Sequence, residues 1–297
     1  MSEVAGAWKK RFAHDGALFR RLAASGARRL PRWWVRHSPP FFGVAAAIAL
    51  PDARRSVRDN LRRIRGEASA FRDAYETAQT FATYACCLAD TLAAGSKNAV
   101  SISAETEGSE HMDAALALQR GCVLLTMHTA GWELATPSFA RASALDVLVV
   151  MQSEPHADAQ RIQNEARAAM GVNVVVVGDD PLAALPLVAH LKRGGAVALQ
   201  ADRVPPSGRT LAVTLAGSPA RIPEGPFRLA QLTGAAIVPT FSARLGPDRY
   251  LLVIYPRVEI ARRASALDLE AAAQQVADAM SAFLRRFPTQ WFHFGER

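Results

Sequence analysis

The pattern of apolar and polar positions divides the chain into two parts near residue 95. Residues 1–95 carry apolar side chains at helical spacing and give little indication of strands. From about residue 100 onward, apolar runs of strand length alternate with amphipathic segments of helix length. Such alternation is typical of βαβ units, in which helices cover both faces of a mostly parallel sheet. The sequence therefore predicts an α/β fold, with a mostly parallel central sheet covered by helices on both faces and an N-terminal helical region.

Most of the expected strands are apolar throughout, as is typical of strands buried on both faces of a sheet. The expected strands are residues 100–104, 122–127, 146–151, 172–177, a run ending at 200, 211–214, 235–240 and 250–255. In the first part, the expected helices are a strongly basic one over 54–65 and a long amphipathic one over 70–94. In the second part they are residues 111–120, 132–142, 157–170, 181–192, 226–233 and 266–287.

We accordingly divide the chain into a basic helical region, residues 1–95, and an α/β domain, residues 96–297. A chain of 297 residues is long enough to bury one substantial core with a small appended region. The sequence contains no Gly-x-Gly-x-x-Gly, no P-loop and no Gly-x-Ser-x-Gly. These absences argue against a dinucleotide-binding protein, a P-loop nucleotidase and a hydrolase with a serine elbow.

The positive charge of the chain is concentrated at its N-terminus. Residues 1–65 carry fifteen Lys and Arg against four Asp and Glu, whereas the remaining residues have a net charge of −3. Aromatic residues are interleaved with these charges, namely Trp8, Phe12, Phe19, Trp33, Trp34, Phe41 and Phe42. Tryptophan beside arginine suits an anionic membrane surface better than a nucleic acid. The alternative is a solvated basic region whose aromatic side chains pack on the core.

The longest apolar run, residues 41–50, is too short to cross a bilayer. It has ten residues between prolines, against the roughly 20 that a membrane span needs. No cleavable signal peptide is evident at the start of the sequence.

Three cysteines, Cys86, Cys87 and Cys122, are too few for a disulfide framework, and we expect them to be reduced and structural. We therefore expect a peripheral protein on the cytoplasmic face of a membrane.

His128 is the first candidate for chemistry, because it directly follows the apolar run at 122–127. Side chains at such a place lie where a strand leaves the sheet, and open α/β sheets bind ligands there. A histidine can accept a proton from a hydroxyl near neutral pH. Glu133 follows five positions later; a carboxylate can fix the tautomer of a histidine, or stabilise the start of a helix. Trp132 would form an apolar wall beside them.

The segment His-Thr-Ala-Gly-Trp-Glu at 128–133 resembles the His-x4-Asp/Glu motif of the lysophospholipid acyltransferase superfamily. Its glutamate form is most similar to the bacterial lipid A biosynthesis acyltransferases. Four more segments resemble blocks of that family in the same order. They are the Asn-Leu pair at 60–61 in an arginine-rich helix, the Ala-Asp within 194–203, the loop and helix start at 217–226 before a strand ending at Pro239, and the Pro-Thr-Gln-Trp at 288–291.

The resemblance implies an acyltransferase that needs neither a metal nor a bound cofactor. The acyl donor would be a thioester of acyl carrier protein or coenzyme A, and the acceptor a hydroxyl of a lipid or glycolipid. His128 would act as the general base on that hydroxyl, and Glu133 would orient or polarise His128. The thioester is already activated, so no covalent acyl-enzyme is required.

The resemblance also suggests residues that bind substrate. Asp202 and Arg203 follow a strand that should end near His128, where they would line the site, hold a phosphate or support the histidine. Alternatively, the two form a surface ion pair of little consequence. Arg221, in a loop of small residues, and Arg167, on the helix expected over 157–170, would bind an anionic headgroup or a donor phosphate. Each of these arginines could equally be a solvated surface residue.

Two departures from the family leave the acceptor open. The chain shows no membrane-spanning N-terminal helix, and Met151-Gln152 stands where relatives tend to carry an arginine. The acceptor is then a lipid A-like molecule, a lysophospholipid, another glycolipid such as a mannoside, or a natural-product alcohol. From other classes, the alternatives are an acyl-thioester hydrolase in which His128 activates water, and a catalytically silent membrane-binding protein. Consumption of a thioester with and without a lipid acceptor separates these readings.

Overall fold

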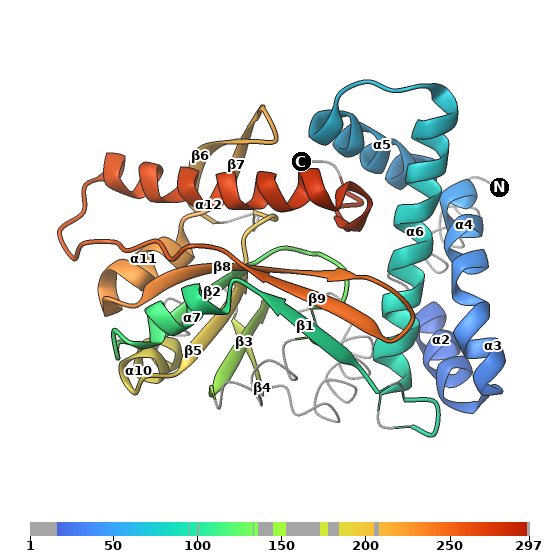
Figure 1. Cartoon of the computed structure of the whole chain (residues 1–297), viewed down its shortest axis with the longest axis horizontal. Coiled ribbons are helices and arrows are strands. Elements are labelled where there is room, and N and C mark those ends of the chain that lie inside the picture. The colour runs from blue at the N-terminus through green and yellow to red at the C-terminus, as the bar shows by residue number, and fades with distance from the viewer. Residues whose placement is uncertain are drawn as a thin grey trace, which may run out of the picture.

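A mostly parallel sheet forms the centre of the molecule (Figure 1). The computed structural model describes residues 17–94, 96–99, 101–132, 134–135, 145–152, 173–177, 184–204 and 208–295. Within these residues the sheet has seven strands in the order β1-β9-β8-β2-β5-β3-β4, and only the β8–β9 pair is antiparallel. The strands are β1 (Ser103–Glu107), β2 (Cys122–Thr126), β3 (Val147–Gln152), β4 (Asn173–Val177), β5 (Ala196–Gln200), β8 (Ala236–Arg244) and β9 (Arg249–Ile254). The predicted α/β class is confirmed.

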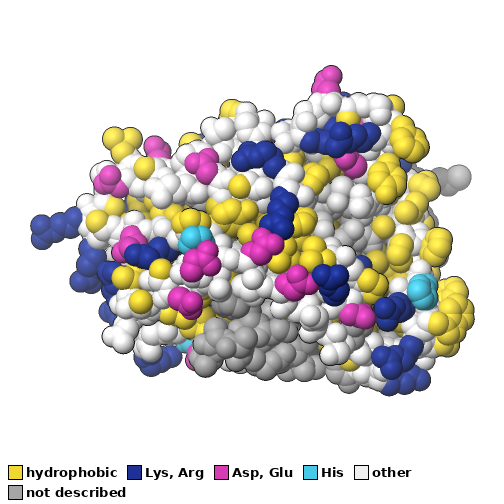
Figure 2. Space-filling view, in the orientation of Figure 1, with side chains coloured by type: hydrophobic (Ala, Val, Ile, Leu, Met, Phe, Trp, Pro, Cys, Tyr) yellow, Lys and Arg dark blue, Asp and Glu magenta, His cyan; other side chains and the backbone are white. Residues whose placement is uncertain are grey.

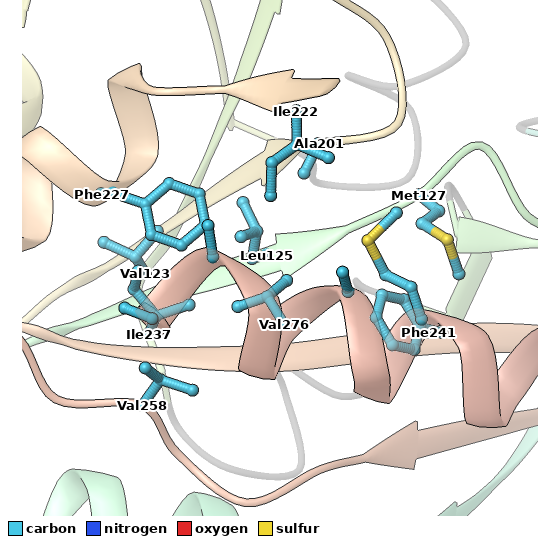
Figure 3. Packing of buried hydrophobic residues seen from close by; sticks show 14 of the residues in the cluster. Val123, Leu125, Met127, Ala201, Ile222, Phe227, Ile237, Phe241, Val258 and Val276 are labelled. Atoms are coloured by element: carbon cyan, nitrogen blue, oxygen red, sulfur yellow. The ribbon is translucent and has the colours of Figure 1, made fainter. Parts of the chain in front are cut away.

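Both faces of the sheet carry an apolar core, because alternate residues of each strand point to opposite sides. On one face, Val123 and Leu125 of β2 pack among residues of three helices (Figure 3). These helices are α10 (Leu185–Lys192), α11 (Gly225–Thr233) and α12 (Ala266–Arg286). On the other face, Cys122 and Leu124 pack with Met112 of α7 (Ser109–Leu116). A strand buried on both faces has to be apolar throughout, which is the pattern that marked β2 in the sequence.

Five of the described helices precede the sheet and lie beside the strand ends at which β8 is followed by β9 (Figure 1). They are α2 (Ala17–Arg29), α3 (Arg32–His37), α4 (Pro39–Ala49), α5 (Pro51–Arg65) and α6 (Ala70–Ala93). Prolines occupy the first turns of α4 and α5, where the missing N–H has no cost. None of the described helices is long and apolar enough to cross a membrane.

Part of the charge on the basic helix α5 is neutralised within the protein. Arg65 forms ion pairs with Asp73, at 2.5 Å, and with Glu76, both on α6. Arg62 lies 2.7 Å from the same Asp73. These carboxylates are almost completely buried, so the pairs fasten α5 to α6. The sequence predicted a strongly basic helix over 54–65, and two of its arginines have a structural role.

Several predicted boundaries were wrong. β1 begins three residues later than expected, because Ser103 is the first residue in register with β9. Helix α7 ends at Leu116 instead of Arg120, and Gln119 has a positive φ of 54° that stops a helix. Residues 218–223 form a strand, β7 (Ser218–Pro223), antiparallel to β6 (Thr210–Leu215), where a loop was expected. Most of the helix expected over 132–142, and all of that over 157–170, lie outside the described residues.

Gly43 fixes the close approach of α4 to α6 and generates a prediction for stability. A Cβ on Gly43 would lie 2.4 Å from the carbonyl oxygen of Phe81. We expect Gly43→Ala to destabilise the fold by about 1–3 kcal/mol, because the backbone of α6 cannot yield. In the matched control Gly26→Ala, within α2, the Cβ meets only Leu30 at 3.5 Å. That substitution should stabilise by about 0.5–1 kcal/mol. Denaturant unfolding measures both, and equal effects would contradict this packing.

Candidate active site

Two neighbouring parallel strands bring His128 and Asp202 together. Thr126, the last residue of β2, pairs with Gln200, the last residue of β5. The backbone N–H of Ala201 then donates to the carbonyl of Thr126 at 2.9 Å, so the two chains leave the sheet side by side. Nδ1 of His128 lies 2.8 Å from Oδ1 of Asp202. The backbone N–H of His128 donates to the same oxygen at 3.1 Å.

The second oxygen of Asp202 is held by the C-terminal segment. Nε1 of Trp291 donates to Oδ2 at 2.8 Å, and Trp291 itself is buried. The Asp202 side chain is 0% exposed, whereas that of His128 is 24% exposed. The carboxylate is therefore enclosed, and the imidazole is reachable from solvent.

The surroundings of Asp202 and His128 determine which of their atoms carry protons. Burial would raise the pKa of Asp202, but the facing His128, its hydrogen bond, the indole N–H of Trp291 and the nearby Arg203 outweigh that effect. The pKa of Asp202 consequently lies well below its usual range, and the group is a carboxylate at neutral pH. A carboxylate only accepts hydrogen bonds, so Nδ1 of His128 carries the proton. Nε2 of a neutral His128 then has its lone pair free to act as a base.

Backbone contacts anchor the segment that carries Trp291. The N–H of Phe292 donates to the carbonyl of His128 at 2.8 Å. The side chain of Gln290 accepts from the backbone N–H of Arg244 at 2.6 Å and donates to its carbonyl at 3.0 Å. Nδ2 of Asn60, on α5, donates to the carbonyl of His293 at 3.0 Å. The Asn-Leu and Gln-Trp blocks of the sequence thus meet behind the His–Asp pair.

Gly131 makes the sharp turn after His128 possible. Its φ is +79°, a conformation that favours glycine. A Cβ at this position would lie 2.0 Å from the ring of the buried Tyr250. The hydroxyl of Tyr250 in turn donates to Asp90 of α6 at 2.9 Å, so this turn is supported from the N-terminal helices.

An apolar pocket opens at the same ends of the strands. It lies on the face of the sheet that carries Cys122 and Leu124, and most of its walls are aliphatic. The residues that line it are Leu124, Thr126, Trp132, Val149, Val150, Ala198, Leu199, Gln200, Thr240, Ser242 and Leu252. Thr126 and Gln200 precede His128 and Asp202 by two residues each, so the pocket leads to the His–Asp pair.

The other predicted site residues have different surroundings. Trp132 lines the pocket as an apolar wall. The exposed Arg203 donates to the carbonyl of Phe292 at 2.9 Å. The alternative of a surface ion pair between Asp202 and Arg203 is wrong, because the oxygens of Asp202 are buried and accept from His128 and Trp291. Arg221 is exposed on β7 and donates to Thr210 at 2.6 Å, and it is not among the residues that line the described pocket. Glu133 and Arg167 lie outside the described residues.

The three cysteines are buried and free, as the sequence predicted. Burial raises the pKa of Cys87 and Cys122 to about 12 and also raises that of Cys86. All three are therefore neutral thiols at physiological pH, which are poor nucleophiles. Within the described part of the chain, no group of three or more His, Cys, Asp or Glu side chains could hold a metal ion.

Sequence reasoning missed Trp291 as a partner of Asp202. The residue stood within the recognised Pro-x-Gln-Trp block, but nothing in its spacing linked it to a residue 89 positions earlier. The run of ring-bearing residues from Trp291 to Phe294 indicates a buried segment, which was the available signal.

The arrangement places an imidazole, held by a buried carboxylate, near an apolar pocket, and such an imidazole could accept a proton. The family model described as bacterial lipid A biosynthesis acyltransferase matches residues 21–297, and the chain belongs to this family.

Curated relatives come from mycobacteria. The chain is 29% identical over 187 residues to a phosphatidylinositol mannoside acyltransferase of Mycobacterium tuberculosis, a match that covers 62% of this chain and 56% of that protein. A phosphatidylinositol mannoside acyltransferase of Mycolicibacterium smegmatis is 28% identical over 185 residues, covering 61% and 58% respectively. The match thus spans little more than half the length of these relatives.

The lowered pKa of Asp202 predicts a dependence of stability on pH. A carboxyl whose pKa is depressed by folding stabilises the fold above its unfolded pKa, and that contribution is lost as pH falls through the folded pKa. The difference in Tm between wild type and Asp202→Asn should therefore be largest above about pH 5 and shrink on acidification. Thermal unfolding across pH measures it. A difference that does not change with pH would contradict the ionised, paired carboxylate.

Proposed function

We propose that this protein transfers a fatty acyl chain from a thioester of acyl carrier protein or coenzyme A to a hydroxyl of a lipid or glycolipid acceptor. The observation that carries the proposal is the contact of Asp202 with Nδ1 of His128 at 2.8 Å, beside an apolar pocket. Membership in the acyltransferase family supplies the reaction class. The names of the mycobacterial relatives favour a glycolipid acceptor over a lysophospholipid.

His128 would activate the acceptor. As the acceptor oxygen attacks the thioester carbon, its proton moves to Nε2 of His128, and the carbonyl becomes a tetrahedral oxyanion. Asp202 stabilises the imidazolium that forms, because its carboxylate already accepts from Nδ1. When the intermediate collapses, the carbon–sulfur bond breaks and the thiolate takes the proton from His128. The products are an ester and a free thiol, and His128 is again neutral.

The surroundings of the His–Asp pair support direct attack of the acceptor hydroxyl on the thioester, without an acyl-enzyme intermediate. The buried thiols have raised pKa values and are poor candidates for an acyl-enzyme. The apolar pocket would hold the acyl chain, with Trp132 as one of its walls. The exposed guanidinium of Arg203, next to Asp202 in the chain, would attract a phosphate of the donor or acceptor. Glu133, Arg167 and Arg221 remain candidates for orienting His128 and for binding anionic groups.

The N-terminal helices would place this site at an anionic membrane surface. Large apolar side chains on α3 and α4 are exposed, among them Trp33 at 64%, Phe41 at 75% and Ile48 at 71%. Figure 2 shows hydrophobic side chains along the edge of the molecule where Figure 1 places α3 and α4, with basic side chains next to them. Both arrangements suit a lipid interface, where apolar groups insert and arginines meet anionic headgroups. We propose peripheral attachment to the cytoplasmic face of the inner membrane.

Substitution of His128 tests the proposed chemistry. With a long-chain acyl coenzyme A as donor and a phosphatidylinositol mannoside as acceptor, His128→Ala should lower the transfer rate by about 10²–10⁴-fold, since a general base is lost. The control His111→Ala removes a half-exposed histidine on α7 and should leave the rate unchanged.

Thiol release with and without acceptor decides between transfer and hydrolysis. A transferase releases thiol in step with ester formation, whereas equal release without acceptor would identify a thioesterase. A folded His128→Ala protein with a normal transfer rate would refute the general-base mechanism.

Membrane attachment is tested by a pair of matched aliphatic substitutions. Ile48→Ser, alone or with Phe41→Ser, should weaken binding to vesicles containing anionic lipid, because exposed apolar area would be lost from the interface. Leu267→Ser, at the start of α12, removes an equally exposed aliphatic side chain (76%) and should not change binding. Co-sedimentation with the vesicles at low and high salt measures the apolar and the electrostatic contributions to binding. Equal binding of the Ile48 and Leu267 variants would show that α4 is not the attachment surface.

A further inference from the structure

A row of polar side chains separates the apolar pocket from the His–Asp pair. Thr126 ends β2 and Gln200 ends β5, and the two are paired in register. Continuing the parallel register of β2 and β8 places Thr240 beside Thr126. All three side chains line the pocket. His128 and Asp202 follow two residues after Thr126 and Gln200, so the row lies about 7 Å from the pair along the strands.

Only one member of this row has a donor group left without an acceptor among the described residues. The hydroxyl of Thr126 lies 3.4 Å from the carbonyl of Met127, and the hydroxyl of Thr240 donates to the carbonyl of Val238 at 3.2 Å. Nε2 of Gln200 is buried and has no hydrogen-bond partner in the described part of the chain. A buried donor without an acceptor lowers the stability of the fold.

We propose that the side-chain amide of Gln200 donates a hydrogen bond to the carbonyl oxygen of the acyl thioester and to the oxyanion that replaces it. The inference rests on the proposed function and identifies a further catalytic residue for it. With the acyl chain among the aliphatic side chains of the pocket and the thioester carbon near His128, the carbonyl oxygen has to lie between them. That is the level of the sheet that Gln200 occupies.

The amide suits this role chemically. During attack the carbonyl π electrons move to the oxygen, and an N–H donor in a buried place stabilises the developing charge more than water would. On collapse those electrons return, the carbon–sulfur bond breaks, and the thiolate takes the proton that His128 holds. The amide neither gains nor loses a proton at any point. Its effect therefore adds to that of the base and does not depend on pH.

A structural role for Gln200 predicts the opposite effect on stability. A leucine of similar size would suit the aliphatic neighbours Ala198 and Leu199 and would remove the unsatisfied donor. If Gln200 serves catalysis, Gln200→Leu should keep or raise the Tm while it lowers the rate. If Gln200 serves the fold, the same change should lower the Tm.

The test compares Gln200→Leu and Gln200→Met with wild type and with Gln275→Leu in the full-length protein. Gln275 is exposed on α12, and its substitution should not change the rate. With the acyl coenzyme A and acceptor used for His128, we expect both Gln200 variants to lose roughly 10²–10³-fold in kcat. KM for the thioester should change little, the pH profile should keep its shape, and Tm should not fall.

The outcomes separate this inference from the proposed function. If wild type is active, His128→Ala inactive, and both Gln200 variants within a few-fold of wild type, the role of Gln200 is refuted and the function stands. A shifted pH profile would also refute it, because Gln200 would then act through His128. If wild type consumes no thioester, both the function and the role of Gln200 are refuted.

Discussion

The buried carboxylate of Asp202 is the group on which the arrangement of this site depends. A charge enclosed by protein is costly unless hydrogen-bond donors surround it. Here the donors come from the imidazole and backbone of His128 and from the indole of Trp291. Removal of any of them leaves the charge partly unsatisfied. The carboxylate thus fixes the end of β2, the end of β5 and the C-terminal segment relative to one another.

The remaining elements of the fold support these three segments. Asn60 of α5 binds the carbonyl of His293, and Gln290 binds the backbone of Arg244 on β8, so helix and sheet both hold the segment that carries Trp291. Gly131 lets the chain turn against Tyr250. Each contact limits how far the imidazole of His128 can move. The side chain of His128 stays 24% exposed in this arrangement, so the proposed acceptor hydroxyl could reach it from solvent.

The sequence predicted the architecture better than the contacts within the site. Apolar runs identified β2 and β5, and the rule that ligands bind at the carboxyl ends of parallel strands placed His128 and Asp202 near each other. Glu133 was expected to orient His128, and support of the histidine was one of several roles suggested for Asp202. The described contact with Nδ1 comes from Asp202, 74 residues away, and Glu133 lies outside the described residues. Pairing and register of distant strands cannot be read from one sequence, and neither can the approach of Trp291.

Elsewhere the misreadings have equally physical causes. Residues 218–223 contain two prolines and small residues, which favour a loop, yet edge strands such as β7 tolerate proline. The arginines of α5 mark a strongly basic helix, yet the side chain of Arg65 is only 9% exposed and lies between Asp73 and Glu76. In both cases a tertiary contact outweighed the local signal.

Nitrogen-15 NMR of the imidazole of His128 tests the central claim most directly. The chain has seven histidines, and a spectrum of His128→Gln identifies the signals that belong to His128. At neutral pH we expect the tautomer with hydrogen on Nδ1 and a free lone pair on Nε2, and we expect Asp202→Asn to abolish this preference. If hydrogen resides on Nε2 in the wild-type protein, Asp202 does not hold His128 as a base, and the mechanism is wrong.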